Sequence, residues 1–276
     1  MIPKDHITAW RQQAPWLLDA QVEQDLVISR AIVELFRIPE LANGLAFRGG
    51  TALYKLYLTP AARYSEDIDL VQIRPDPIGD TLDRARSVLD PWLGTPRRQL
   101  KDGRVNLVYR FESEDMPALK LRLKLEINTR EHFTELGIAR IPFRVENPWF
   151  TGAADVATYA LDELLGTKLR ALYQRRKGRD LFDLWHAMNT GSVDPSTLVT
   201  CFQRYMAEGA HSVTRAQFEE NLAEKRQQLD FRDDMAPILR QGFAWDVDAA
   251  TDMVLHRLVA RLAGEPWKGD RSTERN

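Results

Sequence analysis

The sequence predicts an α+β protein, with an N-terminal domain that mixes strands and helices followed by an all-helical domain. Residues 105–111 and 119–128 alternate apolar and polar side chains, as strands with one buried face do. After Pro148 this alternation stops and only helical patterns remain. We therefore expect an α/β domain over residues 1–147, a helical bundle over 148–268 and a flexible tail over 269–276.

Helices are expected where apolar residues recur three and four positions apart. In the N-terminal part this pattern covers 21–36 and 78–92, and a short strand centred on 67–71 lies between them. In the C-terminal part the helical stretches are 158–176, 180–190, 195–207, 215–229, 235–242 and 247–262.

The composition is that of a globular protein able to bury a core, since 44% of the 276 residues are hydrophobic and 28% are charged. Charge-free stretches are much shorter than the roughly 18 residues that span a bilayer, and the N-terminus has no apolar signal region. The single cysteine, Cys201, excludes an intramolecular disulfide. The 38 basic and 40 acidic residues give no overall basic field. We expect a cytoplasmic protein without a membrane partner.

Two aspartates on the strand at 67–71 are the first candidate for chemistry. Asp67 and Asp69 are two residues apart, so both carboxylates project from one face while Ile68 points into the core. Like charges this close repel, and a proton, a cation or a divalent metal must neutralise them. Mg²⁺ prefers carboxylate oxygens together with substrate phosphates. The alternative is a surface strand end with two solvated aspartates.

Glu126 lies on the polar face of the alternating strand 119–128. If that strand pairs beside the one with the two aspartates, three carboxylates converge and could hold the metal ions of phosphoryl chemistry. The alternative is that Glu126 forms an ion pair with Lys124, with Arg122 or with a cross-strand cation.

Gly49, Gly50 and Thr51 stand directly before a helical pattern. Glycines at such a position allow close approach of the backbone, and the amides at a helix start can cradle a phosphate. Thr51 could bind phosphate through its hydroxyl or cap the helix. The alternative is that the two glycines form an ordinary turn.

A basic segment runs from Lys168 to Arg179 and contains six cations, enough to bind a triphosphate or a nucleic-acid backbone. The alternative is that these cations complement a helix C-terminus, with Gly178 as its cap. Asp180 can likewise be the N-cap of the next helix, with Asp183 in its first turn.

Taken in order, these segments resemble the AbiEii/AbiGii nucleotidyltransferase toxins, a group that includes the MenT toxins and belongs to the DNA polymerase β-type nucleotidyltransferase superfamily. The resemblance covers about residues 20–190. It is carried by Arg48–Leu53, Arg63–Leu70, Lys124–Asn128, Lys168 and Arg179–Trp185.

The resemblance implies a nucleotidyltransferase-type N-terminal domain, with a mixed β-sheet flanked by helices, and roles for the candidate residues. The implied catalytic residues are Asp67, Asp69, Glu126, Lys168 and Asp183, of which Asp67, Asp69 and Glu126 would bind Mg²⁺. Glu126 would act as a ligand or as a base toward the acceptor hydroxyl. The implied nucleotide-binding residues are Gly49, Gly50, Thr51, Ser65, Lys168 and Arg179.

The same resemblance implies a toxin of a toxin–antitoxin system of the abortive-infection type, which acts in antiviral defence. It would transfer a nucleotide from an NTP to an RNA acceptor, the tRNA 3′ end, release pyrophosphate and arrest translation, opposed by a cognate antitoxin. The alternatives are nucleotidylation of a small molecule or protein, and a non-catalytic module that binds a nucleotide or a partner.

Ser65 suggests a point of regulation, because it stands two residues before Asp67 and so shares the metal face. A phosphate there would compete for the metals. The alternative is a serine that forms a hydrogen bond in the turn before the strand.

Overall fold

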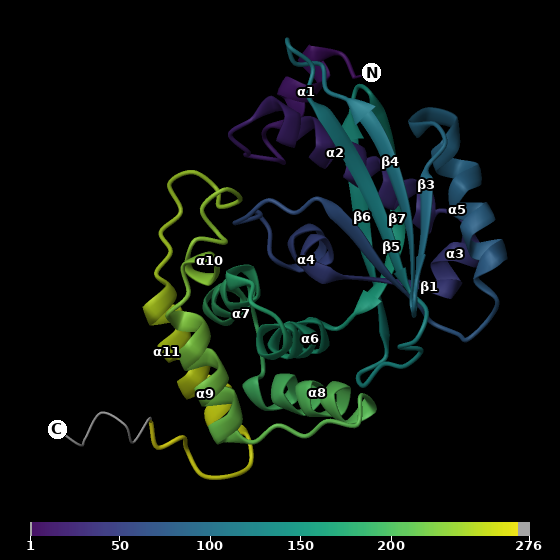
Figure 1. Cartoon of the computed structure of the whole chain (residues 1–276). Helices are drawn as coiled ribbons and strands as arrows, with labels where there is room; N and C mark the ends of the chain where they lie inside the picture. Colours follow the sequence, from purple (N-terminus) through teal and green to yellow (C-terminus); the bar gives the residue numbers. More distant parts are fainter. Residues whose placement is uncertain (1, 270–276) are drawn as a thin grey trace. The chain divides into compact units, whose positions relative to one another are not determined.

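The computed structural model describes residues 2–269 and divides the chain into two compact units (Figure 1). The first unit extends to Ala160 and includes Arg240–Gly242, and the second contains Leu161–Leu239 and resumes at Phe243. The division therefore falls after residue 160, not after 147 as the sequence pattern suggested. Of the predicted flexible tail, residues 270–276 lie outside the described residues.

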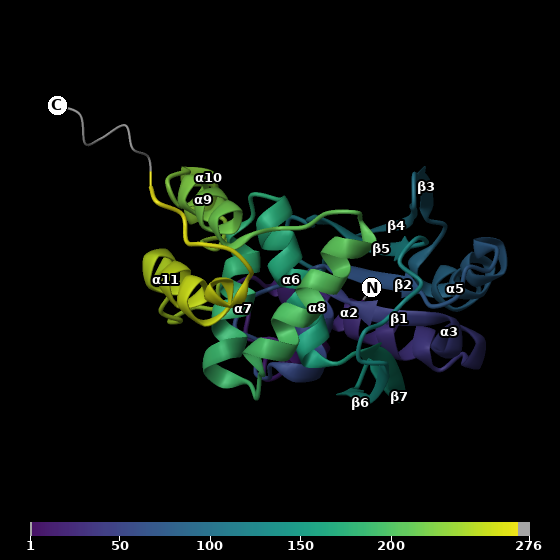
Figure 2. The same ribbon diagram turned by 90° about the horizontal axis from the view of Figure 1, so that it is seen from below.

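A mixed seven-stranded sheet forms the centre of the first unit. Its strands are β1 (Leu45–Arg48), β2 (Asp67–Gln72), β3 (Arg97–Lys101), β4 (Arg104–Glu112), β5 (Lys120–Asn128), β6 (Ile138–Asn147) and β7 (Phe150–Tyr159). Their order is β3-β4-β5-β2-β1-β7-β6, which Figure 2 shows from one edge to the other. The pairs β2–β5 and β1–β7 are parallel and the other pairs are antiparallel. This mixed sheet, flanked by helices, confirms the predicted fold class.

The helices of the first unit are α1 (Lys4–Trp10), α2 (Asp19–Phe36), α3 (Pro39–Gly44), α4 (Gly49–Ala52) and α5 (Ile78–Leu93), with a π-helix, Leu53–Tyr57, directly after α4. Helices α2 and α5 pack against each other and against the apolar face of the sheet. For example, the buried Tyr109 donates a hydrogen bond from β4 to Asp90 on α5. The opposite face of β2 and β5 carries the polar side chains.

A buried charge fixes the segment after α4. Asp25 on α2 forms an ion pair of 2.6 Å with Lys55 of the π-helix. It also accepts hydrogen bonds from the indoles of Trp10 and Trp16. Because all of these donors meet one buried carboxylate, α2 anchors the π-helix that directly follows α4.

Helices joined by turns and loops make up the described part of the second unit, apart from one isolated bridge residue, Leu239. They are α6 (Leu161–Gln174), α7 (Gly178–Thr190), α8 (Pro195–Glu208), α9 (Arg215–Arg226), α10 (Leu229–Arg232), α11 (Val247–Arg257) and a 3₁₀ turn, Val259–Arg261. Cys201 is buried on α8. Among the described residues no helix combines the length and apolar character needed to cross a membrane.

The structure corrects two elements expected from the sequence. Strand β7 occupies 150–159, where a helical domain was expected. Its small residues hide the alternation that would have predicted a strand. Backbone pairing with β1 and β6 holds it in the sheet. The helix expected at 235–242 is a series of turns. It contains Pro237, and at its end the amide of Arg240 donates to the carbonyl of Ala62 instead of to a helical turn.

Candidate functional site

The candidate site in the first unit is assembled by the parallel pairing of β2 with β5. In this register Asp67 lies beside Lys124, and Asp69 lies beside Glu126. Ile68 between the two aspartates is fully buried. The three carboxylates therefore share one face of adjacent strands, as expected if these strands were neighbours.

Cations occupy the space between the carboxylates. Lys124 Nζ lies 3.0 Å from Asp67 Oδ2 and 3.3 Å from Glu126 Oε2. Glu126 Oε1 lies 3.3 Å from Arg104, whose guanidinium donates to it. Burial alone would lower the pKa of Lys124, but its hydrogen bond with Asp67 and the surrounding carboxylates raise it overall. Glu126 therefore forms both of the alternative ion pairs, one with the neighbouring Lys124 and one with the cross-strand Arg104.

The surrounding cations leave part of the negative charge of Asp67 and Asp69 uncompensated. Asp67 Oδ1 is buried and has no hydrogen-bond partner among the described residues. Burial raises the pKa of Asp69, and repulsion from Asp67 raises it further, although Arg48 acts in the opposite sense. Within residues 2–269, no three histidine, cysteine or acidic side chains lie close enough together to hold a metal ion. The pair alone suits Mg²⁺ when substrate phosphates complete its coordination, as is usual for this ion.

Gly49 and Gly50 are required by close contacts within the protein. Gly49 has a φ of +80°, and a Cβ there would lie 2.2 Å from Asp69 Oδ2. A Cβ on Gly50 would lie 2.4 Å from Arg63 Nη2. The first glycine thus leaves room for the carboxylate of Asp69, and the second leaves room for the buried guanidinium of Arg63.

The hydroxyl of Thr51 connects this turn to β2. Its Oγ1 lies 2.5 Å from the carbonyl oxygen of Asp67 and 2.9 Å from Ser65 Oγ. Thr51 does not cap α4, whose N-cap is Arg48. The bond with Ser65 matches the alternative of a serine held in the turn before the strand. This small network fixes the backbone at the point where the first aspartate enters the sheet.

Arg48 is a site residue that sequence reasoning did not single out. It is opposite Asp69 in the β1–β2 register, and its guanidinium lies 2.5 Å from Glu131 Oε2. Its position directly before the two glycines is the sequence signal that could have identified it.

In the second unit, a buried ion cluster joins α6 to α7. Lys168 Nζ lies 2.8 Å from Asp183 Oδ2 and 3.3 Å from Asp180 Oδ1. Arg175 also binds Asp180, through Nε at 2.6 Å and Nη2 at 2.8 Å. Both aspartates are fully buried. The structure therefore brings Lys168 and Asp183 together, as a pair within this unit.

The two capping alternatives for the basic segment are wrong. Asp180 does not cap α7, because the N-cap is Lys177 and the amide of Arg179 in the first turn donates to Asp234 instead. Gly178 does not end α6 but begins α7, where a Cβ would lie 2.2 Å from the carbonyl oxygen of Phe231. Arg179, expected at the nucleotide, binds both oxygens of Asp234 at 2.9 Å. Much of the basic charge of this segment is therefore compensated locally.

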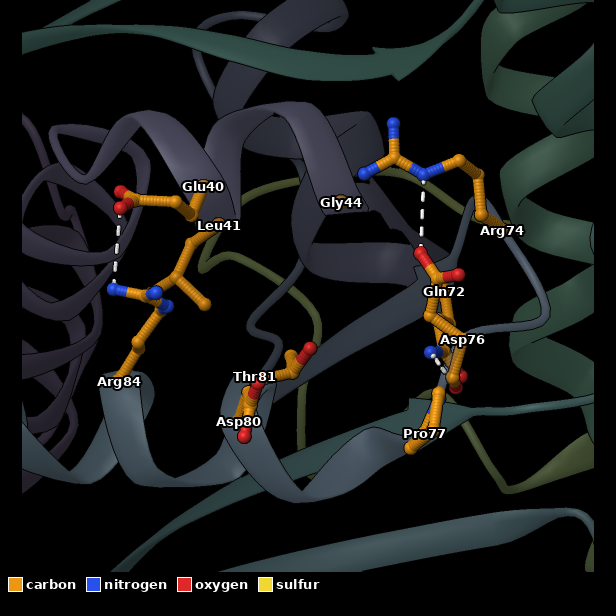
Figure 3. Close-up of a pocket in the computed structure, with 10 residues that line it drawn as sticks. All are labelled: Glu40, Leu41, Gly44, Gln72, Arg74, Asp76, Pro77, Asp80, Thr81 and Arg84. Atoms are coloured by element: carbon orange, nitrogen blue, oxygen red, sulfur yellow. Dashed lines mark hydrogen bonds and ion pairs between the residues drawn. The ribbon is translucent and has the colours of Figure 1, made fainter.

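A separate pocket of about 370 Å³ lies at the other end of β2 (Figure 3). Its two arginines are already paired, Arg74 with Asp76 at 3.1 Å and Arg84 with Glu40 at 3.1 Å. Because carboxylates neutralise both arginines, the pocket offers little attraction for a triphosphate. The carboxylate pair on β2 remains the stronger candidate.

Comparisons with known proteins identify the family of this chain and a shared fold. Residues 30–253 match the family described as "Nucleotidyl transferase AbiEii toxin, Type IV TA system". The structure is similar to that of MenT4, a nucleotidyltransferase toxin from Mycobacterium tuberculosis H37Rv, with a TM-score of 0.67 and 16% identity over 96% of this chain and 91% of that chain. This likeness shows a shared fold.

An antigenic nucleotidyltransferase-like protein from Paracoccidioides brasiliensis is also similar, with a TM-score of 0.42 and 16% identity over 83% of this chain and 92% of that chain. No curated protein matches the sequence. Since the family match spans most of the chain and includes both the carboxylate site and the Lys168–Asp183 cluster, the protein belongs to the AbiEii nucleotidyltransferase toxin family and is a nucleotidyltransferase.

Proposed function

We propose that this toxin transfers a nucleotide from an NTP to the 3′ end of an RNA, with tRNA as the acceptor, and thereby blocks translation. The observation that carries the proposal is the carboxylate pair on β2, with one buried oxygen lacking a partner, next to Glu126 on the parallel strand. In the reaction, the acceptor 3′-hydroxyl oxygen bonds to the α-phosphorus of the NTP. The bond from that phosphorus to the bridging oxygen breaks, and pyrophosphate leaves.

The residues of the first unit have distinct tasks in this proposal. Asp67 and Asp69 would hold Mg²⁺, which when bound neutralises charge on the phosphates. Glu126 would take the proton of the acceptor hydroxyl, since it lies beside Asp69 in the strand register. Gly49 leaves room for the Asp69 carboxylate, and its backbone would approach the triphosphate.

The second unit would contribute Lys168 and Asp183. A buried lysine with a carboxylate at 2.8 Å is held in one orientation, which suits a group that contacts phosphate oxygens during transfer. Arg179 and Ser65 remain candidates for nucleotide contact. In the cell, a cognate antitoxin would oppose the toxin.

Incorporation of labelled NTP into total RNA with Mg²⁺ tests the proposal. The wild-type protein should label RNA, whereas Asp67→Ala should not. A matched control is Asp76→Ala, because this exposed aspartate follows the same strand at its other end and should leave labelling intact.

Three outcomes contradict the proposal. Equal labelling by wild type and Asp67→Ala would exclude the carboxylate mechanism. Label that resists RNase would instead indicate a protein or small-molecule acceptor. Toxicity that persists in Asp67→Ala would indicate a binding module without catalysis.

A further inference from the structure

Basic side chains gather on the polar face of β3, β4 and β5, beside the carboxylate site. Residues directly opposite in antiparallel strands share a face, so the register places six exposed cations together. We call this surface the basic face, which consists of Arg97, Lys101, Arg104, Arg110, Lys120 and Arg122. The same face of these strands carries two carboxylates, Glu112 and Glu126, as well as Lys124 of the site.

Most of this positive charge is uncompensated. Arg104 and Arg122 have carboxylate partners, Glu126 and Glu66, each at 3.3 Å. The other four cations of the basic face form no ion pair with any residue of the described chain. A surface depression of about 420 Å³ is lined by Arg110, Lys120 and Arg122 among its six residues.

Two cross-strand pairs place like charges opposite each other, whereas Lys120 is opposite Glu112. Arg110 is directly opposite Arg122, and Lys101 is directly opposite Arg104. Such pairs destabilise an antiparallel sheet. Charges on an edge strand also prevent edge-to-edge aggregation, but this explains only β3, since β4 and β5 have neighbours on both sides. A bound polyanion would explain the pairs on the inner strands as well.

We propose that the basic face binds the sugar–phosphate backbone of a single-stranded RNA whose 3′ end reaches Asp67 and Asp69. This inference rests on the proposed function. It gives the RNA acceptor a path, by which we mean the route along the basic face to the two aspartates. Lys120, Arg122 and Lys124 stand at every second position of β5, about 7 Å apart, and lead directly to Asp67. An extended strand of phosphates repeats at a similar spacing.

The composition of the face favours RNA backbone over an acidic protein partner. Protein interfaces rely on buried apolar and aromatic anchors, and no aromatic side chain stands on this face of the three strands. The absence of aromatic stacking platforms on this face also predicts binding with little base preference. Affinity should instead come from phosphate contacts and fall steeply with salt.

Fluorescence anisotropy with a short 5′-fluorescein single-stranded RNA, measured over a series of KCl concentrations, tests the path. The protein carries Asp67→Asn so that binding is read without turnover. Replacing Arg110, Lys120 or Arg97 with Gln should weaken binding several-fold and lower the slope of log affinity against log salt by about 0.7 for each cation removed. Arg98→Gln is the matched control, because Arg98 is exposed on the same strand as Arg97 but opposite Leu107, on the other face.

The outcomes separate this inference from the proposed function. Unchanged binding in the three variants, or an equal loss in Arg98→Gln, would overturn the path even if wild type labels RNA. Poly-glutamate binding as tight as RNA binding would overturn it in favour of an acidic protein partner. If wild type fails to label RNA, the proposed function fails separately, whatever the anisotropy shows. Arg110→Gln should not lower the melting temperature, since it removes the repulsion with Arg122.

Discussion

At the scale of single residues, Gly49 makes the most restrictive contact of the candidate site. Gly49→Ala would place a methyl group 2.2 Å from Asp69 Oδ2 and would strain a backbone with φ of +80°. We expect a loss of about 1–2 kcal/mol in unfolding free energy from the backbone. Displacement of Asp69 should lower nucleotide incorporation by about 100-fold.

A second glycine provides the control for this prediction. Gly94 has a φ of +77° but no atom within 4 Å of its hypothetical Cβ. Gly94→Ala should therefore cost a similar free energy of unfolding and keep its activity. Comparable activity loss in both variants would show that strain, not the contact with Asp69, controls the reaction.

Lys124 supports a second residue-scale prediction. Its ammonium group neutralises Asp67 and Glu126 when no metal is bound, so Lys124→Met should lower stability in EDTA by on the order of 1–3 kcal/mol. Mg²⁺ should then raise the melting temperature of the variant more than that of wild type. The exposed Lys120 on the same strand face gives the control, Lys120→Met. An identical Mg²⁺ shift in wild type and Lys124→Met would refute the prediction.

At the scale of elements, the α6–α7 pair depends on a buried cation. Lys168→Met removes the ammonium group 2.8 Å from Asp183 Oδ2 and should destabilise the protein by about 3–5 kcal/mol in urea unfolding. Lys177→Met is the control, because Lys177 is half exposed and lies 3.5 Å from Asp234, so its loss should cost less than about 1 kcal/mol. If Lys168→Met lost activity without losing stability, Lys168 would contribute to substrate binding and not to the stability of the α6–α7 pair.

The elements that hold the first-unit site were largely predictable from the sequence. Strands β2 and β5 showed clear patterns because one face of each is buried, and the two-residue spacing placed Asp67 and Asp69 together. Strand β7 was not predictable, since Gly152 and its alanine neighbours give no contrast between faces. That Lys124 bridges two carboxylates also depends on strand pairing far apart in the sequence, which a count of charges cannot show.

At the scale of the whole molecule, the nearly equal numbers of 38 basic and 40 acidic residues do not show how unevenly the charges are distributed. The segment from Lys168 to Arg179 was expected to be the basic surface, but Asp180, Asp183 and Asp234 compensate much of its charge. Exposed cations without ion pairs collect instead on the polar face of β3–β5, beside the carboxylates. Local sequence density of charge therefore does not show where the unpaired cations lie, because ion pairing decides which charges are compensated.

The pH dependence of stability provides the final prediction. Glu23 on α2 is 1% exposed, and burial raises its pKa to about 7 from 4.5. Between these values the folded protein binds more protons than the unfolded chain, so stability falls as pH rises from about 4.5 to 7.

Glu23→Gln keeps an acceptor for the amide of Glu114 but cannot ionise. Its melting temperature should exceed that of wild type by several degrees at pH 8, and the difference should vanish below about pH 4. The exposed Glu40→Gln should show no such trend, and a pH-independent difference for Glu23→Gln would refute the prediction.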